Sequence, residues 1–304
     1  MSEVAKRRLV WLASYPKSGN TWMRMLLAAY QHNRVVEFEL TDAYRATMSA
    51  SRRNEFERIT GQSELSTLEI DQARQRVQED IAKRVRPPVL LKTHDARMRH
   101  NGYPLIRNEL TLGAIYVVRN PLDVVDSFAD HMGLSIDRAI AKMNHPGYTI
   151  GGPHESLVKQ HLSTWSEHVC SWCNQREFPV HLVRYEDLKT HLTPTLRNIL
   201  TFLGWPIDCD RLDYAVKQTQ FSKLQQKEDS DGFSERSNKS KGGRFFRQGR
   251  SGHWRENLTR KQIDLIVHDH RETMGEMGYL SSDDSPQGVE ELSQPFAETT
   301  HSIR

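Results

Sequence analysis

Positively charged side chains and one histidine close three apolar runs of the sequence. Lys17 follows the first run, Lys92 and His94 end the second, and Arg119 ends the third, with Ser127 a short distance beyond it. In an open α/β sheet, ligands bind outside the carboxyl ends of the strands, so these side chains are expected to meet at one edge. Lysine and arginine hold anions, and an imidazole with a pKa of about 6.5 accepts a proton at neutral pH. The pattern therefore predicts an anion-binding site that contains a general base.

The loop after the first apolar run has the composition of a phosphate-binding turn. It reads SYPKSGNTW over residues 14–22, and Gly19 permits the positive φ that a tight turn needs. The helix that follows offers N–H groups and the positive end of its dipole to an anion, to which Lys17 adds a charge and Thr21 a hydroxyl. A P-loop that hydrolyses ATP or GTP has the pattern G-x-x-x-x-G-K-[ST], whereas here the lysine precedes the glycine. The loop thus predicts phosphate binding without a metal ion.

The apolar runs alternate with helical patterns, which is typical of a parallel sheet covered on both faces. Strands are predicted at residues 8–14, 89–95, 112–120 and 179–185. Helices are predicted between and after them, among others at 66–85, 156–177 and 260–274. The first of these begins with a capping-box pattern, Ser66 followed by Glu69. We expect an α/β fold of three layers, with a parallel sheet flanked by helices and a P-loop-like strand, loop and helix at its start.

The length of 304 residues suits a single domain, which we place at residues 1–280. Polar, helix-prone composition at about 41–86 indicates a helical insertion, and residues 133–155 are expected to be irregular. A polar, glycine-bearing stretch at about 228–250 is predicted to be a mobile lid. Residues 281–304 have the composition of a disordered tail.

Six motifs in order along the chain resemble those of the sulfotransferases that use 3′-phosphoadenosine 5′-phosphosulfate (PAPS). They are SYPKSGNTW at 14–22, KTH at 92–94, YVVRNPLDVVDS at 116–127, VRYEDL at 183–188, TQFSKL at 219–224 and FFRQGRSGHWRENLT at 245–259. The family usually reads Tyr-Pro-Lys-Ser-Gly-Thr-Thr-Trp and Arg-Lys-Gly-x-x-Gly-x-Trp in the first and last of these. Asn20 and Gln248 therefore stand where the family has a threonine and a lysine.

The resemblance implies a role for each matching residue. The 5′-phosphosulfate is expected to lie against Lys17, Ser18, Gly19, Asn20, Thr21 and Trp22. The adenine is expected to lie among Trp22, Tyr185, Thr219 and Phe221. The 3′-phosphate is expected to contact Arg119, Ser127, Arg247, Gln248 and Gly249. The catalytic residues implied are His94 as general base, Lys17 beside the leaving phosphate and Lys92 beside the sulfuryl group.

The composition limits the partners. Lysine and arginine number 42 against 39 aspartates and glutamates, and the net charge of +3 is too small to require nucleic acid. No apolar run approaches the roughly 18 residues that a membrane span needs, and three cysteines favour a reducing compartment. We therefore expect a cytoplasmic enzyme, monomeric or a weak homodimer, that neither binds nucleic acid nor enters a membrane. An atypical P-loop small-molecule kinase and a non-catalytic nucleic-acid-binding protein are the alternatives.

The acceptor is expected to be a small molecule, such as a natural product, that offers a hydroxyl in preference to an amine. The loops that should form its site are of mixed polarity with few aromatic residues, which favours a polar or charged acceptor. Met132, Met143 and Tyr148 are candidates for its walls, although packing within the fold explains them equally well. His131 is expected to be solvated.

Two further features of the sequence are assigned to structure rather than chemistry. Cys170 and Cys173 form a C-x-x-C pair inside the predicted long helix, where core packing is favoured over a metal or redox role. Asp95 follows His94 on a predicted strand, and neighbouring side chains on a strand face opposite ways. Asp95 is therefore not expected to orient the imidazole of His94.

Overall fold

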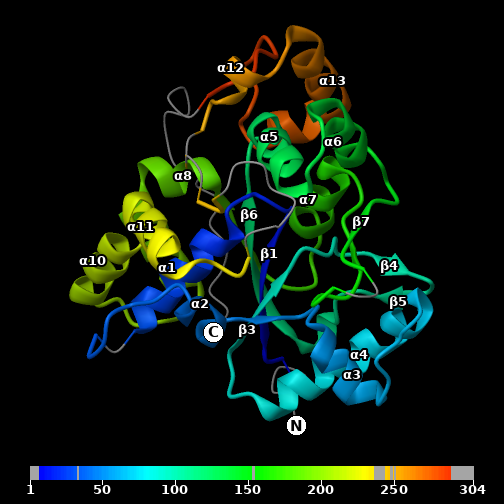
Figure 1. Ribbon diagram of the computed structural model, residues 1–304, viewed down its shortest axis with the longest axis vertical. Coiled ribbons are helices and arrows are strands. Elements are labelled where there is room, and N and C mark those ends of the chain that lie inside the picture. The colour runs from blue at the N-terminus through cyan, green and yellow to red at the C-terminus, as the bar shows by residue number, and fades with distance from the viewer. Residues whose placement is uncertain are drawn as a thin grey trace.

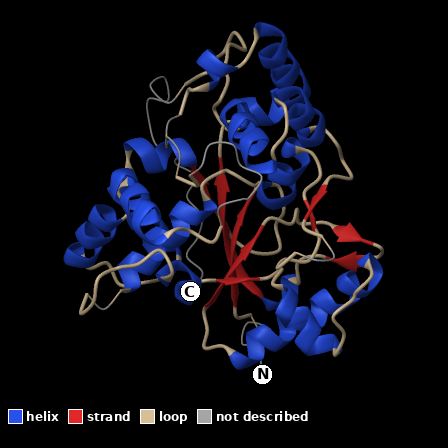
Figure 2. Ribbon diagram, viewed as in Figure 1, coloured by secondary structure: helices blue, strands red, loops and turns tan. Residues whose placement is uncertain are grey.

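The fold is seen in a computed structural model that describes residues 7–32, 34–152, 155–235, 244–246, 249 and 251–288 (Figure 1). A five-stranded sheet forms its centre, in the order β2-β3-β1-β6-β9, and every neighbouring pair is parallel (Figure 2). The strands are β1 Leu9–Ser14, β2 Met48–Ser49, β3 Val89–Thr93, β6 Thr111–Val118 and β9 Val180–Arg184. The four predicted strands and the three-layer class are confirmed. β2 was not predicted, because two residues carry no periodic signal.

Helices cover both faces of the sheet, because alternate residues of β1 point into two separate cores. Val10 and Leu12 pack into the core that holds α1 Asn20–Gln31, α2 Asp42–Ala46, α8 Tyr185–Thr190, α9 Leu192–Phe202, α10 Cys209–Gln218 and α11 Phe221–Asp231. Leu9 and Trp11 pack into the core that holds α3 Arg53–Thr60, α4 Thr67–Arg84, α5 Pro121–Met132, α6 Ile136–Met143, α7 Trp165–Cys173, α12 Trp254–Asn257 and α13 Arg260–Glu276. Within the described ranges, none of these helices has both the length and the apolar character needed to cross a bilayer.

The segment at residues 41–86 contains α2, β2, α3 and α4, so it contributes a strand to the sheet as well as helices. The capping box that opens α4 is present as predicted. The Ser66 hydroxyl accepts a hydrogen bond from the Glu69 N–H at 3.3 Å, and the Glu69 carboxylate accepts one from the Ser66 N–H at 2.8 Å. These bonds satisfy two of the N–H groups that a helix start leaves without a partner.

The prediction of one helix over residues 156–177 is wrong. Ser163 has a φ of 61°, which lies outside the helical region, and α7 begins only at Trp165. Thr164 and Glu167 form the capping box that starts this shorter helix, which ends at Cys173. The Thr-x-x-Glu spacing was visible in the sequence and marks the true helix start.

Residues 133–155 are more regular than predicted. The Ser135 hydroxyl accepts a hydrogen bond from the Arg138 N–H at 3.3 Å and caps α6. Two short antiparallel pairs lie beside the central sheet, namely β4 Arg99–His100 with β5 Tyr103–Pro104 and β7 Thr149–Ile150 with β8 Gln160–His161. The pairing of β7 with β8 thus joins a segment that was predicted to be irregular to a segment that was predicted to begin the long helix.

The predicted lid and tail are described only in part. α11 continues to Asp231, and residues 236–243, 247, 248 and 250 of the lid lie outside the described residues, as do residues 289–304 of the tail. Residues before 289 contact the rest of the fold. The Gln287 N–H donates to the Tyr279 carbonyl at 2.9 Å, and the Asn120 side-chain amide donates to the Gln287 carbonyl at 3.2 Å.

Candidate active site

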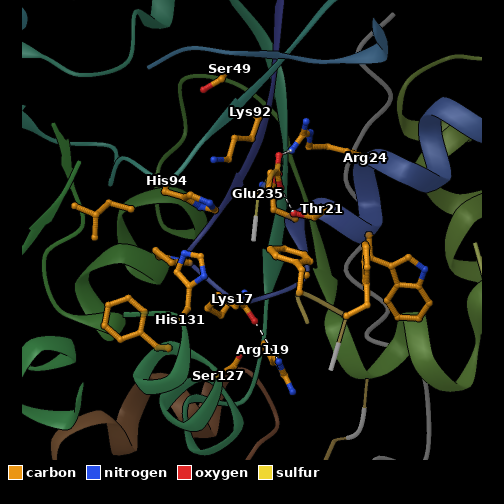
Figure 3. A pocket seen from close by; sticks show the side chains of 18 of the residues that line it. Lys17, Thr21, Arg24, Ser49, Lys92, His94, Arg119, Ser127, His131 and Glu235 are labelled. Carbon is orange, nitrogen blue, oxygen red and sulfur yellow. Dashed lines mark hydrogen bonds and ion pairs between the residues drawn. The ribbon is translucent and has the colours of Figure 1, made fainter. Parts of the chain in front are cut away.

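A cavity of about 960 Å³ opens at the carboxyl ends of β1, β3, β6 and β9 (Figure 3). In the view of Figure 3, Lys92 and His94 lie on one side of Lys17, and Arg119 lies on the other side with Ser127. The structure thus brings together the side chains that end three apolar runs of the sequence. The predicted site residues that line the cavity are Lys17, Gly19, Asn20, Thr21, Trp22, Lys92, His94, Arg119, Ser127, Tyr185, Phe221 and Gly249. Arg247 and Gln248 lie outside the described residues.

The turn between β1 and α1 depends on Gly19. Its φ is 103°, in the region that L side chains rarely adopt. A Cβ atom at this position would lie 2.5 Å from Cδ2 of Tyr185. The backbone of the turn therefore packs directly against the Tyr185 ring, and only glycine allows this approach.

The N-terminus of α1 is left open toward the cavity. Among the described residues, no side chain caps its first turn, and that turn contains no acidic residue. The Asn20 amide turns back into the fold, where it donates to the Leu12 carbonyl at 2.9 Å and to the Ser14 hydroxyl at 3.3 Å. The first-turn N–H groups and the positive end of the helix dipole are thus available to an anion.

Two cations flank this helix end. The Lys17 ammonium lies 4.2 Å from the centroid of the Phe245 ring. The Arg119 guanidinium donates to the Lys17 carbonyl at 3.2 Å and lies over the Tyr185 ring, 4.4 Å from its centroid. Stacking on the tyrosine fixes the plane of the guanidinium, which suits forked binding of an anion.

Three aromatic rings and a glycine form what we call the aromatic wall, namely Trp22, Tyr185, Phe221 and Gly249. The rings of Trp22 and Tyr185 meet edge to face with centroids 5.7 Å apart. Gly249 has a φ of 56°, and a Cβ atom there would lie 2.5 Å from Cδ2 of Phe221. The wall is therefore aromatic and apolar, and two of its rings are in close contact with glycine backbone.

Two predicted site residues support the cavity from behind rather than lining it. Thr219 is fully buried, and its hydroxyl donates to the Ala215 carbonyl at 2.7 Å. Its carbonyl accepts the indole N–H of Trp22 at 2.9 Å and so holds that ring in the aromatic wall. Ser18 is also fully buried, with its N–H donating to the Tyr15 carbonyl at 3.3 Å.

His94 is held in one tautomer. Its Nδ1 lies 2.7 Å from the Ser14 carbonyl oxygen, and a carbonyl can only accept, so Nδ1 carries the ring proton. The basic lone pair is therefore on Nε2. Burial lowers the pKa of His94 well below its ordinary value, and the charge of Lys92 lowers it further. At neutral pH the ring is neutral and able to accept a proton.

Lys92 lies beside His94 at the end of β3. Burial lowers the pKa of Lys92 to about 8, although the nearby carboxylate of Glu235 acts in the opposite direction. The ammonium therefore remains mainly protonated at neutral pH, but it loses its proton more readily than an exposed lysine.

The backbone of His94 is fixed by side chains from other elements. Its N–H donates to the side-chain oxygen of Gln160 at 3.2 Å, and its carbonyl accepts a hydrogen bond from Nε2 of His168 at 3.1 Å. The Asp95 carboxylate points away and pairs with Arg74 at 2.9 Å. As expected from the alternation of side chains along a strand, Asp95 does not hold the imidazole of His94.

A second group of lining residues comprises Arg52, Ile150, Leu157 and Gln160, which we call the β8 wall. The pairing of β7 with β8 and an isolated bridge between Arg52 and Leu157 hold it together. This wall mixes a cation, an amide and aliphatic groups, so it presents both polar and apolar contacts to the cavity.

A family model for the sulfotransferase domain matches residues 7–278. The chain belongs to the sulfotransferase family. It is 30% identical to mouse Sulfotransferase 2A1 over 166 residues, which is 53% of this chain and 56% of that protein. It is 25% identical to human Sulfotransferase 1C2 over 276 residues, 86% of this chain and 82% of that protein. The match to the first of these relatives thus spans little more than half of its length.

Solved structures of two proteins resemble this sulfotransferase fold. Mouse sulfotransferase SULT7A1 complexed with PAP has a TM-score of 0.55 at 20% identity, covering 90% of this chain and 86% of that one. Retinol dehydratase in complex with androsterone and inactive cofactor PAP has a TM-score of 0.57 at 17% identity, covering 90% and 81%. The family resemblance predicted from the six motifs is confirmed, and these structures share the fold.

The sequence did not indicate two charged residues of this sulfotransferase cavity, Arg24 and Glu235. The Glu235 carboxylate accepts hydrogen bonds from the Thr21 hydroxyl at 2.7 Å and from Arg24 at 2.5 Å (Figure 3). Burial would raise the pKa of Glu235, but the charges of Arg24 and Lys92 hold it below its ordinary value. Arg24 lies one turn after Asn20 on α1, a spacing that could have revealed it, whereas nothing in the sequence around Glu235 marks it.

His131 was expected to be solvated, and the structure places it on the cavity lining instead, next to Met132. Burial lowers the pKa of His131 to about 4, and the charge of Lys17 adds to this effect. Of the other candidates for the acceptor walls, Met143 is buried in the core and Tyr148 packs against that core. His131 lies near the end of α5, and this helix begins just after the strand end that carries Arg119. That position could have indicated that His131 lines the cavity.

Proposed function

We propose that this chain is a sulfotransferase that moves the sulfuryl group of PAPS to a hydroxyl, in preference to an amine, of a small molecule. The observation that carries the proposal is the meeting of an uncapped helix N-terminus with a neutral, oriented histidine in one cavity. Membership of the sulfotransferase family supports it, as do the relatives with that name.

The chain's own residues suit a phosphorylated nucleotide. The open end of α1 and the Lys17 ammonium would hold the 5′-phosphosulfate. The aromatic wall would hold the adenine. Arg119 and Ser127 would hold the 3′-phosphate, and we extend this role to the predicted residues Arg247, Gln248 and Gly249. When bound, PAPS supplies the sulfuryl group and leaves as 3′-phosphoadenosine 5′-phosphate (PAP).

His94 would act as the general base. Nε2 accepts the proton of the acceptor hydroxyl as its oxygen bonds to sulfur, and the Ser14 carbonyl stabilises the imidazolium through Nδ1–H. The low pKa of His94 keeps the ring neutral before transfer. The same burial makes the ring a weaker base, so proton uptake should accompany bond formation rather than precede it.

Lysine side chains would stabilise the charge that develops during transfer. In-line transfer places negative charge on the equatorial oxygens and on the leaving phosphate, so fixed cations lower the barrier. Lys92 lies beside His94, where the sulfuryl oxygens would pass, and Lys17 lies at the helix end, where the phosphate would remain. No metal ion is needed for this arrangement of charges.

The β8 wall, with His131 and Met132, would contact the acceptor. Its mixture of arginine, amide and aliphatic side chains suits a small molecule with both polar and apolar parts. The structure of retinol dehydratase contains androsterone, which supports a small organic acceptor here. We further propose one domain over residues 1–280 and a cytoplasmic protein that is monomeric or a weak homodimer.

The test is a transfer assay with the purified chain, PAPS and a library of hydroxyl- and amine-bearing small molecules. Mass spectrometry should detect PAP together with a product heavier than its acceptor by one sulfuryl group. ATP with Mg²⁺ in place of PAPS should give no product. Phosphorylated products from ATP, or no PAPS-dependent product from any acceptor by a chain that binds PAP, would contradict the proposal.

A further inference from the structure

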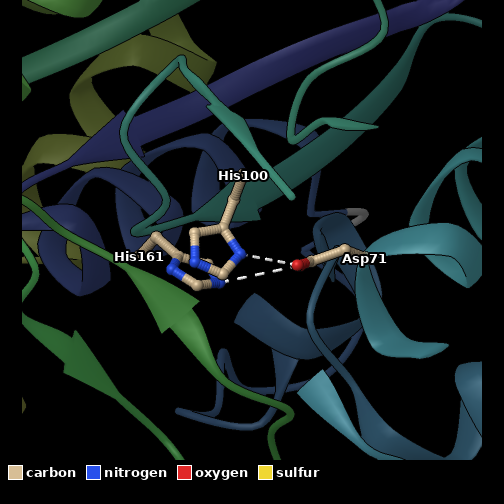
Figure 4. Close-up of side chains that lie close together, drawn as sticks. All are labelled: Asp71, His100 and His161. Carbon is tan, nitrogen blue, oxygen red and sulfur yellow. Dashed lines mark hydrogen bonds and ion pairs between the residues drawn. The ribbon is translucent and has the colours of Figure 1, made fainter. Parts of the chain in front are cut away.

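A second cluster of chemically active side chains lies behind the β8 wall. The imidazoles of His100 on β4 and His161 on β8 point toward the carboxylate of Asp71 on α4 (Figure 4). One possible ligand atom from each residue lies within 4.8 Å of the other two. Asp71 and His161 are buried, whereas the His100 side chain is 33% exposed. The cluster therefore has fixed walls and one side open to solvent.

Two polar atoms of this cluster lack the partners that burial demands. Within the described part of the chain, neither Oδ1 of Asp71 nor Nε2 of His161 has a hydrogen-bond partner. They lie 3.6 Å apart, which is too long for a hydrogen bond between them. Two ligands of a tetrahedral zinc ion, each about 2.0–2.1 Å from the metal, lie about 3.3 Å apart. A metal ion between the two atoms would satisfy both after a shift of a few tenths of an ångström.

The other oxygen of Asp71 is already occupied, so the carboxylate has a fixed orientation. Nδ1 of His100 lies 2.6 Å from Oδ2, and the Asn101 amide donates to the same oxygen at 3.0 Å. Metal ligation by Nδ1 would replace the first of these hydrogen bonds and leave the second in place. The rings of His100 and His161 lie with centroids 3.9 Å apart, so both imidazoles reach the same carboxylate.

The charge around the cluster tolerates a dication. Nε of Arg74 lies 3.8 Å from Oδ1 of Asp71, and Nη1 of the same guanidinium pairs with Asp95 at 2.9 Å. Two carboxylates and one guanidinium leave a net charge of −1, apart from the two imidazoles. Arg74 therefore offsets only one of the two carboxylates.

We propose that Asp71, His100 and His161 form a binding site for a zinc-class divalent metal ion, with a fourth position open to water. Two imidazoles and one carboxylate suit zinc, whereas Mg²⁺ and Ca²⁺ require oxygen ligands. The ion would join three elements that are distant in the sequence, α4, β4 and β8. This site is separate from the proposed sulfuryl transfer and would exist whether or not that activity does.

The ion would also stabilise the part of the cavity that carries His94. The backbone N–H of His161 donates to the Asp95 carboxylate at 2.8 Å, and the backbone N–H of Ala96 donates to the His161 carbonyl at 2.7 Å. The preceding residue on β8, Gln160, accepts a hydrogen bond from the backbone N–H of His94 through its side-chain oxygen. A metal on His161 would therefore fix β8 against the strand end that holds the proposed base.

The test is metal retention by the full chain. Protein stripped with EDTA is incubated with ZnCl₂, dialysed against metal-free buffer and measured by inductively coupled plasma mass spectrometry. Wild type should retain about one zinc per chain, and His100→Ala and Asp71→Asn should retain less than a tenth of that. His100→Ala tests the site most cleanly because the side chain is partly exposed, and its metal-free form should melt within about 2 °C of metal-free wild type. If the melting temperature of metal-free His100→Ala falls outside this range, His100→Gln is used instead.

Two matched controls identify the ligands. His268→Ala removes an exposed histidine of α13, and Cys170→Ser with Cys173→Ser removes the C-x-x-C pair; both variants should retain zinc. Zinc at about 100 times its dissociation constant should raise the melting temperature of wild type by roughly 5 °C and leave that of His100→Ala unchanged. Wild type that retains no zinc would overturn the proposal. Zinc that is retained by His100→Ala and Asp71→Asn but lost from the double cysteine variant would overturn it too.

Discussion

The aromatic wall and the β8 wall of the cavity are built in different ways. Two rings of the aromatic wall, Tyr185 and Phe221, press against glycine backbone at Gly19 and Gly249, where a single Cβ atom would collide with them. The β8 wall rests on strands of two residues and on side-chain hydrogen bonds between distant elements, such as that from the His94 N–H to Gln160. One wall is fixed by close packing of rings on glycine backbone, and the other by short strands and side-chain hydrogen bonds.

This difference between the walls shows how one fold could retain the same sulfuryl donor while its acceptor changes. A wall made by glycine turns tolerates almost no substitution, because any side chain displaces a ring. A wall made by side-chain contacts changes its shape and polarity with each substitution. Under the proposed function, the nucleotide would bind at the aromatic wall and the acceptor at the β8 wall.

The largest effect is expected at His94, whose backbone N–H is held by Gln160 of the β8 wall. His94→Ala removes the proposed base and should lower the rate of transfer by about 10²–10⁴-fold. The affinity for PAP should stay within about threefold of wild type, because the anion-binding end of α1 is untouched. Steady-state kinetics and calorimetry measure the two quantities. His145→Ala, at an exposed histidine, is the control; a His94→Ala enzyme with near-normal turnover would remove the base assignment.

The aromatic wall is tested by Gly19→Ala. The added Cβ combines an unfavourable φ with a collision against Tyr185, and should lower the free energy of unfolding by about 3 kcal/mol. Gly61→Ala is the matched control, since Gly61 has a φ of 75° with nothing within 4 Å of an added Cβ. It should cost only about 1 kcal/mol. Urea unfolding gives both values, and equal losses would show that the contact with Tyr185 does not matter.

Acid should destabilise the protein through its buried histidines. Burial lowers the pKa values of His131, His168, His181 and His270 to about 4, and that of His94 well below its ordinary value. The unfolded chain, with histidine pKa values of about 6.5, therefore binds more protons than the folded chain between pH 6.5 and 4. Stability is retained above pH 6.5 and falls below it, by up to about 1.4 kcal/mol per pH unit for each histidine.

Urea unfolding at pH 7.5, 6.0 and 5.0 measures this loss. His168→Gln, which removes one of these groups from behind His94, should reduce the slope. A free energy of unfolding that is the same at pH 7.5 and 5.0 would contradict the neutral, buried state of these rings.

Hydrogen exchange at pH 6 sharpens the comparison of the two walls. Backbone amides of the β8 wall should exchange faster than those of the aromatic wall, because His94 and His168 adjoin the β8 wall.

The smallest effect is expected at Gln160. Gln160→Ala removes one hydrogen bond to the His94 N–H and should lower kcat by roughly 2–10-fold, the equivalent of about 0.5–1.5 kcal/mol. PAP should bind as it does to wild type. A loss of PAP affinity equal to the loss of kcat would mean that the two walls are not independent.

What could be predicted from the sequence rests on signals that act within a few residues. The anion-binding turn, with Lys17 and Gly19, was predictable because backbone conformation and helix polarity act within a few residues. The strand ends at His94 and Arg119 followed from apolar runs that occur in any buried parallel strand. These local signals placed most of the cavity.

The parts that failed depend on contacts between distant segments. A strand of two residues such as β7 or β8 has no periodicity, and its existence rests on its partner. Glu235 meets Thr21 and Arg24 only after folding. The start of α7 is different, because the capping box of Thr164 and Glu167 was present in the sequence and was overlooked in favour of a longer helix.

The central claim is that the cavity binds a nucleotide with phosphates at both the 5′ and 3′ positions. Isothermal titration calorimetry of the purified chain with PAP and with AMP tests it most directly, because the two ligands differ only in the 3′-phosphate. Charge-assisted hydrogen bonds from Arg119 and its neighbours should make PAP bind roughly 10–100-fold more tightly than AMP. Equal affinities for PAP and AMP would contradict the account.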